Sequence, residues 1–158
     1  MHLDFSAIAK GYAVDQLSRR LSEVGVNHHL VDVGGELAVR GKNASGVAWR
    51  LAVEQPDKQY GVAQLVFALG DGGVATSGDY RNYFIVEGKR YSHTIDPISG
   101  YPVEHNLASV TVIHDEAMVA DAWATALSVL GFERAKSVAM EQQLAVYLLE
   151  RELSLIHI

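Results

Sequence analysis

The spacing of apolar and polar residues changes along this chain from a helical period to an extended one and back again. Near the start, residues 7–24 carry apolar side chains at spacings that place them on one face of a helix: Ile8, Val14, Leu17, Leu21 and Val24. Gly25 follows as a stop signal. We therefore predict a helix over 7–24, with Asp15 and Arg19 forming an i, i+4 pair on its solvent-exposed side.

The middle of the chain is dense in short runs of β-branched and aromatic residues that are separated by Gly, Asp or Pro. The runs predict strands at residues 28–41, 49–56, 63–70, 72–78, 82–88, 89–96 and 109–114, and a last strand at 144–150. The first run is interrupted at Gly34-Gly35, which is typical of a turn, a bulge or a close backbone approach. We expect hairpin tips at Asp71-Gly72-Gly73 and at Glu87-Gly88.

The helical period returns in residues 116–130 and 132–142, which are separated by Gly131. Together these segments predict an α+β fold in which helices flank a mixed, mainly antiparallel sheet. No internal repeat or linker divides the chain, so we predict a single domain over residues 1–152. Residues 153–158, LSLIHI, match the translated end of a sequencing adapter, and we expect them to be an artefact outside the fold. A native apolar strand is the alternative.

Composition narrows the classes of function. The chain has 158 residues with 13 Lys and Arg against 19 Asp and Glu, a formal net charge of −6, and no basic stripe, which argues against nucleic acid as a partner. It has no cysteine, which excludes disulfides, thiolate metal sites and a cysteine nucleophile. No apolar run approaches the roughly 20 residues that a transmembrane helix needs.

Asp121 and Thr125 are candidate metal ligands. They are spaced i, i+4 on the helix predicted at 116–130, so their side chains lie on the same face about one turn apart. Hard oxygen ligands of this kind suit Mg²⁺, which binds one or two carboxylates and completes its coordination with phosphates and water. The alternative is a local contact in which Asp121 bonds Thr125 or caps a turn.

Lys10 lies at the start of the first predicted helix, where unpaired N–H groups and the helix dipole favour a phosphate. The alternative is a solvated surface lysine. His93, between hydroxyl residues and shortly before Asp96-Pro97, can act as an acid, a base or a phosphate donor, or can be a structural histidine of the turn. The glycines at 34–35 and the Ser77-Gly78 turn allow a backbone to approach a ligand closely, or form structural turns.

Several segments of the chain, taken together and in this order, resemble the FAD:protein FMN transferase family, often called the ApbE family. They are residues 4–15 (DFSAIAKGYAVD), 31–37 (VDVGGEL), 75–84 (ATSGDYRNYF), 91–102 (YSHTIDPISGYP) and 121–131 (DAWATALSVLG). The resemblance implies an ApbE-like flavin transferase fold and an enzyme that moves FMN from FAD to a Thr or Ser of an acceptor protein through a phosphoester. AMP is released, and Mg²⁺ is required.

The resemblance also implies roles for individual residues. The metal ligands correspond to the Ala7 carbonyl, Asp121 and Thr125, and Lys10 corresponds to a lysine near the FAD phosphates. Asp4 and Ile95 correspond to positions that contact the cofactor, and His93 to a histidine that assists proton transfer or positions the pyrophosphate. From the glycine turns described above, we also expect cofactor contacts at Gly34, Gly35, Ser77 and Gly78. The acceptor hydroxyl must lose a proton, and both His93 and Asp121 are candidate catalytic bases.

Two other activities fit the same residues. One is a Mg²⁺-dependent FAD pyrophosphatase that releases FMN and AMP, and the other is a non-catalytic FAD-binding module. The combination of Asp121, Thr125 and Lys10 argues against the module, because a carrier does not need a metal on the pyrophosphate.

The length of the chain indicates that it is part of a longer protein. Members of the family are longer than this chain, and the part preceding the region matched here supplies some of the flavin pocket and, in many members, a lipoprotein or secretion signal. We therefore expect Met1 to be an internal start and the isolated fragment to be incomplete as an enzyme. The resemblance implies a periplasmic or inner-membrane lipoprotein location and an acceptor such as a subunit of a membrane redox complex.

Overall fold

The computed structural model describes residues 3–56, 61–78, 83–86, 88–151 and 156–157. The helices are α1 (Ala9–Glu23), α2 (Ala117–Leu130) and α3 (Phe132–Glu141). The strands are β1 (His29–Val33), β2 (Glu36–Arg40), β3 (Trp49–Glu54), β4 (Ala63–Leu69), β5 (Gly72–Gly78), β6 (Tyr83–Val86), β7 (Lys89–Ser92), β8 (Leu107–His114), β9 (Ala145–Glu150) and β10 (Ile156–His157). Each predicted helix and strand is found, but two strand boundaries differ. β8 begins two residues before its predicted start, and β7 ends at Ser92, four residues before its predicted end, so His93 follows the strand.

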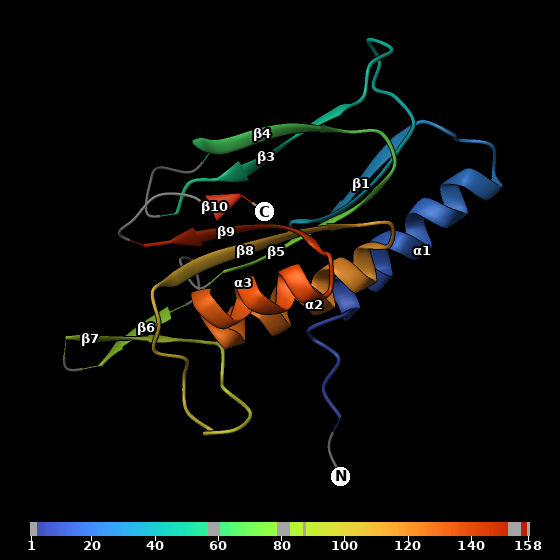
Figure 1. Ribbon diagram of the computed structural model, residues 1–158. Coiled ribbons are helices and arrows are strands. Elements are labelled where there is room, and N and C mark those ends of the chain that lie inside the picture. Colours follow the sequence, from blue (N-terminus) through green and yellow to red (C-terminus); the bar gives the residue numbers. More distant parts are fainter. Residues whose placement is uncertain (1–2, 57–60, 79–82, 87, 152–155, 158) are drawn as a thin grey trace.

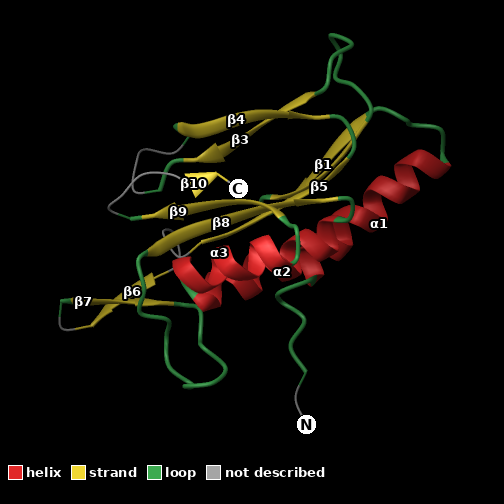
Figure 2. Ribbon diagram, in the orientation of Figure 1, coloured by secondary structure: helices red, strands yellow, loops and turns green. Residues whose placement is uncertain are grey.

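Helices and strands form three layers (Figures 1 and 2). Six strands make one sheet in the order β1-β2-β5-β8-β9-β10, and every strand pair in the described part of the chain is antiparallel. The three helices cover one face of this sheet, the β3–β4 hairpin covers the other, and the β6–β7 hairpin stands apart at one end. The predicted α+β fold with a mainly antiparallel sheet is confirmed.

Side chains of β9 alternate between the two faces of the sheet and contribute to the core on both. In β9, Val146 and Leu148 pack with buried residues of α2 and α3, whereas Tyr147 and Leu149 pack with Val53 of the β3–β4 hairpin. Successive residues of a strand point to opposite faces, so one strand serves both layers. Because both faces of β9 are covered, its sequence is a continuous apolar run rather than an alternating one.

The buried side of α1 differs from the predicted one. Val14 is fully buried, but Leu17 and Val24 are 50% and 60% exposed, and the buried positions are Gly11, Val14 and Ser18. The predicted pair of Asp15 with Arg19 is also wrong, because the Asp15 carboxylate accepts hydrogen bonds from the first turn of α2. The reason is the same in both cases: α2 packs against the Gly11 side of α1, and the apolar stripe alone does not reveal that neighbour.

The two glycine pairs have different roles. Gly34 and Gly35 form the turn between β1 and β2, and both adopt the left-handed φ values, 64° and 96°, that favour glycine in a two-residue hairpin loop. The hairpin tip predicted at Asp71-Gly72-Gly73 is wrong, because β4 pairs with β3 while β5 pairs with β2 and β8. Gly72 and Gly73 instead begin β5, where a Cβ on Gly73 would overlap the backbone of Ala117.

Two predictions concern residues near the limits of the described chain. β6 and β7 pair as a hairpin, as expected for a tip at Glu87-Gly88, although Glu87 itself lies outside the described residues. Ile156 and His157 pair with Leu148 and Tyr147 of β9, while 153–155 and 158 lie outside the described residues, so the assignment of 153–158 to an adapter stays a prediction. Within the described part of the chain, no helix has the length and apolarity needed to cross a bilayer.

Candidate active site

The candidate site is built where the start of α1 meets the start of α2. Gly11, in the first turn of α1, lies so close to α2 that a Cβ there would overlap the carbonyl of Ala117. On the other side of Ala117, Gly73 of β5 also leaves no room for a Cβ. The backbone of α2 is therefore wedged between two glycines, which fixes the position of the residues one turn further along α2.

Asp121 occupies that next turn. Its side chain is only 4% exposed, and its Oδ2 accepts a hydrogen bond from the backbone N–H of Gly11 at 2.9 Å. Burial raises the pKa of the Asp121 carboxyl above its ordinary value, although the Gly11 N–H and the charge of Lys10 favour the carboxylate. The hydrogen-bond partner of Asp121 is thus Gly11 on α1, and not Thr125 on its own helix, as the alternative of a local contact would require.

Lys10 is paired with a carboxylate that sequence reasoning missed. Its Nζ lies 2.7 Å from Oε1 of Glu36, which is 2% exposed in its side chain and begins β2. The other oxygen, Oε2, is buried and finds no hydrogen-bond partner in the described part of the chain. Burial raises the pKa of Glu36, and the neighbouring charge of Asp121 adds to this effect, whereas Lys10 opposes it. Lys10, Glu36 and Asp121 therefore form one electrostatic cluster.

A signal in the sequence could have indicated Glu36. It directly follows the Gly34-Gly35 turn and shares the inward face of β2 with Ala38, two residues later. A carboxylate at an inward position of a strand is rare unless it has a partner or a function. The hairpin turn also lies against this pair, since a Cβ on Gly34 would be 3.5 Å from Cδ of Lys10.

Thr125 and Ala7 complete the predicted metal set. Thr125 lies one helical turn after Asp121 on α2 and is half-buried. Ala7 lies in the turn before α1. The N–H of Ala9 is donated to the carbonyl of Phe5, before Ala7, and the N–H of Tyr12 to the carbonyl of Ile8, after it. The N–H of Gly11, which a continuing helix would direct at Ala7, is donated to Asp121.

These donors fit a small, hard cation. No group of three or more His, Asp or Glu side chains converges as a metal site within the described residues. What the site offers is a buried carboxylate, a hydroxyl on the same helix face and a backbone carbonyl, with the orphaned Oε2 of Glu36 nearby. Mg²⁺ prefers such a sparse set of oxygen ligands because substrate phosphates and water supply the rest.

Three of the residues predicted to contact a flavin nucleotide, Asp4, His93 and Ile95, lie outside the named helices and strands. Asp4, before α1, is exposed and accepts a hydrogen bond from the N–H of Ser6 at 2.8 Å. His93 is exposed after β7, and Ile95 is 50% exposed and forms an isolated bridge with Pro102. The segment that contains Asp4 and the loop after β7 both project from the lower side of the molecule in Figure 1.

Ser77 and Gly78 lie at the end of β5, beside α2. The hydroxyl of Ser77 donates a hydrogen bond to Ser128 at 3.2 Å. Gly78 and Ser128 line a small cavity together with Ser92 and Thr94, the two neighbours of His93. Because Ser128 follows Thr125 by three residues on α2, the His93 segment reaches the helix that carries Asp121. The structure does not place His93 itself in the Lys10–Glu36–Asp121 cluster.

The buried carboxylates predict how stability depends on pH. Because the folded state raises the pKa of Glu36 above its ordinary value of 4.5, the folded state binds this proton more tightly than the unfolded state does. We expect the free energy of unfolding of the metal-free chain to fall as pH rises through the folded pKa of Glu36. Glu36→Gln, which keeps the shape without the charge, should make this fall shallower.

Urea unfolding across a pH series with EDTA measures the effect. Glu141→Gln is the matched control, since Glu141 is an exposed carboxylate at the end of α3. Equal pH slopes for the wild type and Glu36→Gln would contradict the assignment of the buried charge to Glu36.

Comparisons with known proteins identify the family of the chain. The model of the ApbE family matches residues 1–148. The chain is 47% identical over 152 residues to the FAD:protein FMN transferase of Escherichia coli K12, which covers 96% of this chain and 43% of that protein. It thus spans less than half the length of such curated relatives.

Solved structures show the same fold. The apo form of the flavinyl transferase ApbE of Pseudomonas stutzeri superposes with a TM-score of 0.85 at 48% identity, over 96% of this chain and 47% of that chain. The ApbE protein of Thermotoga maritima gives a TM-score of 0.87 at 31% identity, over 98% of this chain and 50% of that chain. With a family model that covers nearly all of its residues and relatives well above 30% identity, this chain belongs to the ApbE family.

Proposed function

We propose that this chain carries the metal- and phosphate-binding part of a Mg²⁺-dependent transferase that moves FMN from FAD to a Thr or Ser hydroxyl of an acceptor protein. The observation that carries the proposal is the buried Asp121 carboxylate, held by the Gly11 N–H next to the Lys10–Glu36 pair. Its relatives are named for transfer of FMN from FAD to protein.

The charge of the cluster supports a cation in the site. Two buried carboxylates face one lysine, so the cluster is net negative when both are ionised, and a bare pyrophosphate would be repelled from it. Asp121, Thr125 and the carbonyl of Ala7 are the groups that would hold Mg²⁺, which when bound neutralises phosphate charge and orients the pyrophosphate. Lys10 would then bind a phosphate oxygen while Glu36 holds its ammonium group in place.

The transfer itself breaks one bond and forms one. The acceptor oxygen bonds to the phosphorus of the FMN half, the bond from this phosphorus to the bridging pyrophosphate oxygen breaks, and AMP leaves. The hydroxyl proton passes to a base. His93, which is exposed and therefore accessible to an acceptor, and Asp121, which lies inside the cluster, are the two candidates.

Product analysis tests this proposal against its two alternatives. A full-length version of the protein is incubated with FAD, Mg²⁺ and a peptide that contains Ser and Thr, with the Escherichia coli relative as positive control. A mass gain of one FMN on the peptide together with AMP supports transfer. Free FMN and AMP without an adduct would support the pyrophosphatase, and FAD binding that is insensitive to EDTA, without any product, would support the binding module.

Partner and location belong to the same proposal. We propose an acceptor on a membrane redox complex subunit and a periplasmic or inner-membrane location on the basis of the family resemblance. Flavinylation of a candidate subunit by the protein in its native host, detected by mass spectrometry and lost on deletion of the gene, tests this part.

A further inference from the structure

Helix α2 begins without a cap of its own. Glu116, the residue before it, makes no side-chain capping bond, and the first turn contains no acidic residue. The first N–H groups of a helix have no partner within it and need an acceptor. The N–H groups of Ala117 and Met118 donate to Oδ1 and Oδ2 of Asp15, at 3.0 Å and 2.8 Å. Asp15 thus supplies from α1 both the acceptors and the negative charge that the start of α2 lacks.

A second link joins the same helices in the opposite direction. The N–H of Gly11, in the first turn of α1, donates to Asp121 on α2 at 2.9 Å. Asp15 follows Gly11 by one turn, and Asp121 follows Ala117 by one turn. Each helix therefore gives a carboxylate to the first turn of the other. Between the two links lies the contact of Gly11 with Ala117, which leaves no space for adjustment.

We propose that Asp15 is a positioning residue of the Asp121 site. Its two hydrogen bonds to the start of α2 fix the rotation and translation of α2 relative to α1, and these direct Asp121 towards Gly11 and Lys10. This inference rests on the proposed function only for its effect on metal and FAD binding. Its structural part, the dependence of the Gly11–Asp121 bond on Asp15, is independent of any activity.

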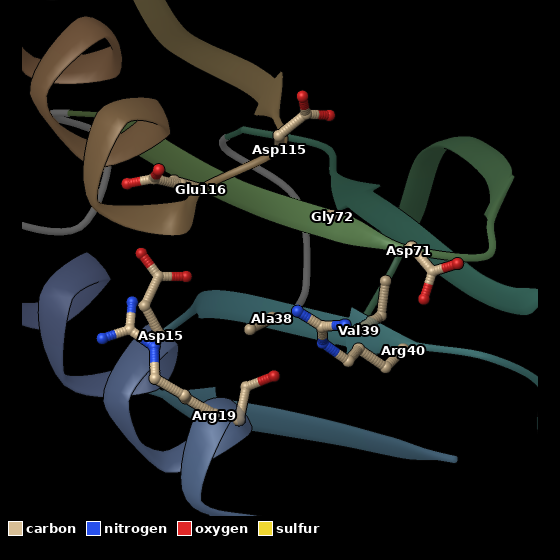
Figure 3. Close-up of a pocket in the computed structure, with 10 residues that line it drawn as sticks. Asp15, Arg19, Ala38, Val39, Arg40, Asp71, Gly72, Asp115 and Glu116 are labelled. Carbon is tan, nitrogen blue, oxygen red and sulfur yellow. The ribbon is translucent and has the colours of Figure 1, made fainter. Parts of the chain in front are cut away.

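A cavity beside Asp15 gives the proposal a direct test. This cavity of about 360 Å³ lies between α1, β2 and the loop before α2, and Asp15, Arg19 and Arg40 are among its lining residues (Figure 3). Both arginines are exposed and line the cavity together with Asp15. Asp71, Asp115 and Glu116 line the same cavity, so formate is added at high concentration beside an equal concentration of chloride. This tests whether a small carboxylate can take the place of the Asp15 side chain in Asp15→Ala.

The experiment compares Asp15→Ala with Asp115→Ala, a matched control that removes an exposed carboxylate from the lining of the same cavity. Amide hydrogen exchange is read at Gly11 and Met118, with Val112 and Leu148 of the sheet as internal references. Mn²⁺ binding by electron paramagnetic resonance and FAD titration with Mg²⁺ provide the functional readout. In Asp15→Ala we expect faster exchange at both helix amides, unchanged exchange in the sheet, and a roughly 10-fold loss of metal affinity, as is typical when a residue that orients a ligand is removed.

Formate should restore the Gly11 protection and the metal affinity of Asp15→Ala and should have no effect on the control. Faster exchange at Met118 with unchanged Gly11 exchange and metal affinity would overturn the proposal, because Asp15 would then be a helix cap only. If Asp15→Ala does not fold, Asp15→Ser, which keeps one acceptor, replaces it. If the wild type binds neither Mn²⁺ nor FAD, the proposal that this chain by itself holds the metal and the nucleotide fails, while exchange at Gly11 and its rescue by formate still decide the positioning role.

Discussion

Replacing Asp121 with alanine should abolish the Mg²⁺ dependence of FAD binding. The variant loses the buried carboxylate at the centre of the site, next to Lys10 and Glu36. Removing a residue that supports a metal ligand commonly costs about 10- to 100-fold in affinity, so loss of a ligand should exceed roughly 100-fold. Calorimetric titration of FAD with Mg²⁺ or with EDTA measures the change, and Mn²⁺ binding by electron paramagnetic resonance checks the metal site without FAD.

Two further variants separate charge from shape. Asp121→Asn keeps an oxygen that can accept the Gly11 N–H but lacks the negative charge, and it should lose metal binding as fully as the alanine variant does. Glu141→Ala removes an exposed carboxylate from the end of α3 and should bind like the wild type. If Asp121→Ala bound FAD with the wild-type dependence on Mg²⁺, Asp121 would not be a metal ligand.

Gly11→Ala should destabilise the protein by about 3 kcal/mol, at the upper end of the roughly 1–3 kcal/mol cost of overpacking a close contact. In an isolated helix the same change would stabilise by up to about 1 kcal/mol, because alanine is the better helix former. In this protein the change in stability has the opposite sign, because the added methyl group would overlap the Ala117 carbonyl and force α1 and α2 apart. The same separation should lengthen the Gly11–Asp121 bond and weaken metal binding.

Urea unfolding of Gly11→Ala beside Gly70→Ala measures this effect. Gly70 is the matched control, since the nearest atom to its added Cβ would be the Gly41 carbonyl oxygen at 4.0 Å, within ordinary contact distance. The control should retain wild-type stability within about 0.5 kcal/mol, as expected of an unstrained substitution away from the core. A Gly11→Ala variant as stable as the control would show that the helices can separate freely.

The local elements of the fold were accessible from the sequence. Each depends on the periodicity of its own segment and on glycines that end it, such as Gly25 after α1 and Gly131 between α2 and α3. These signals act over a few residues, so they do not require knowledge of neighbouring elements. For the same reason the i, i+4 spacing of Asp121 and Thr125 correctly predicts that both lie on one helix, one turn apart.

Partners far apart in the sequence were not accessible in this way. Glu36 meets Lys10 across 26 residues, and Asp15 meets Ala117 across 102. The i, i+4 spacing predicted a pair of Asp15 with Arg19. In the structure α2 lies beside α1, and the Asp15 carboxylate instead accepts hydrogen bonds from two N–H groups of α2 that have no partner within their own helix.

By itself, then, the sequence determined the helices, the strands, the family resemblance and the residue types of the site, because periodicity and motifs are properties of neighbouring residues. Only the tertiary structure decided that Val14 rather than Leu17 is buried and that Gly73 allows the backbone of α2 to approach β5 instead of forming a turn. It also decided that Glu36 lies with Lys10 and Asp121 in one cluster. The physical reason is that each of these outcomes depends on which helix or strand lies next to the residue. Close packing between elements sets these neighbours, and the sequence of a single element does not.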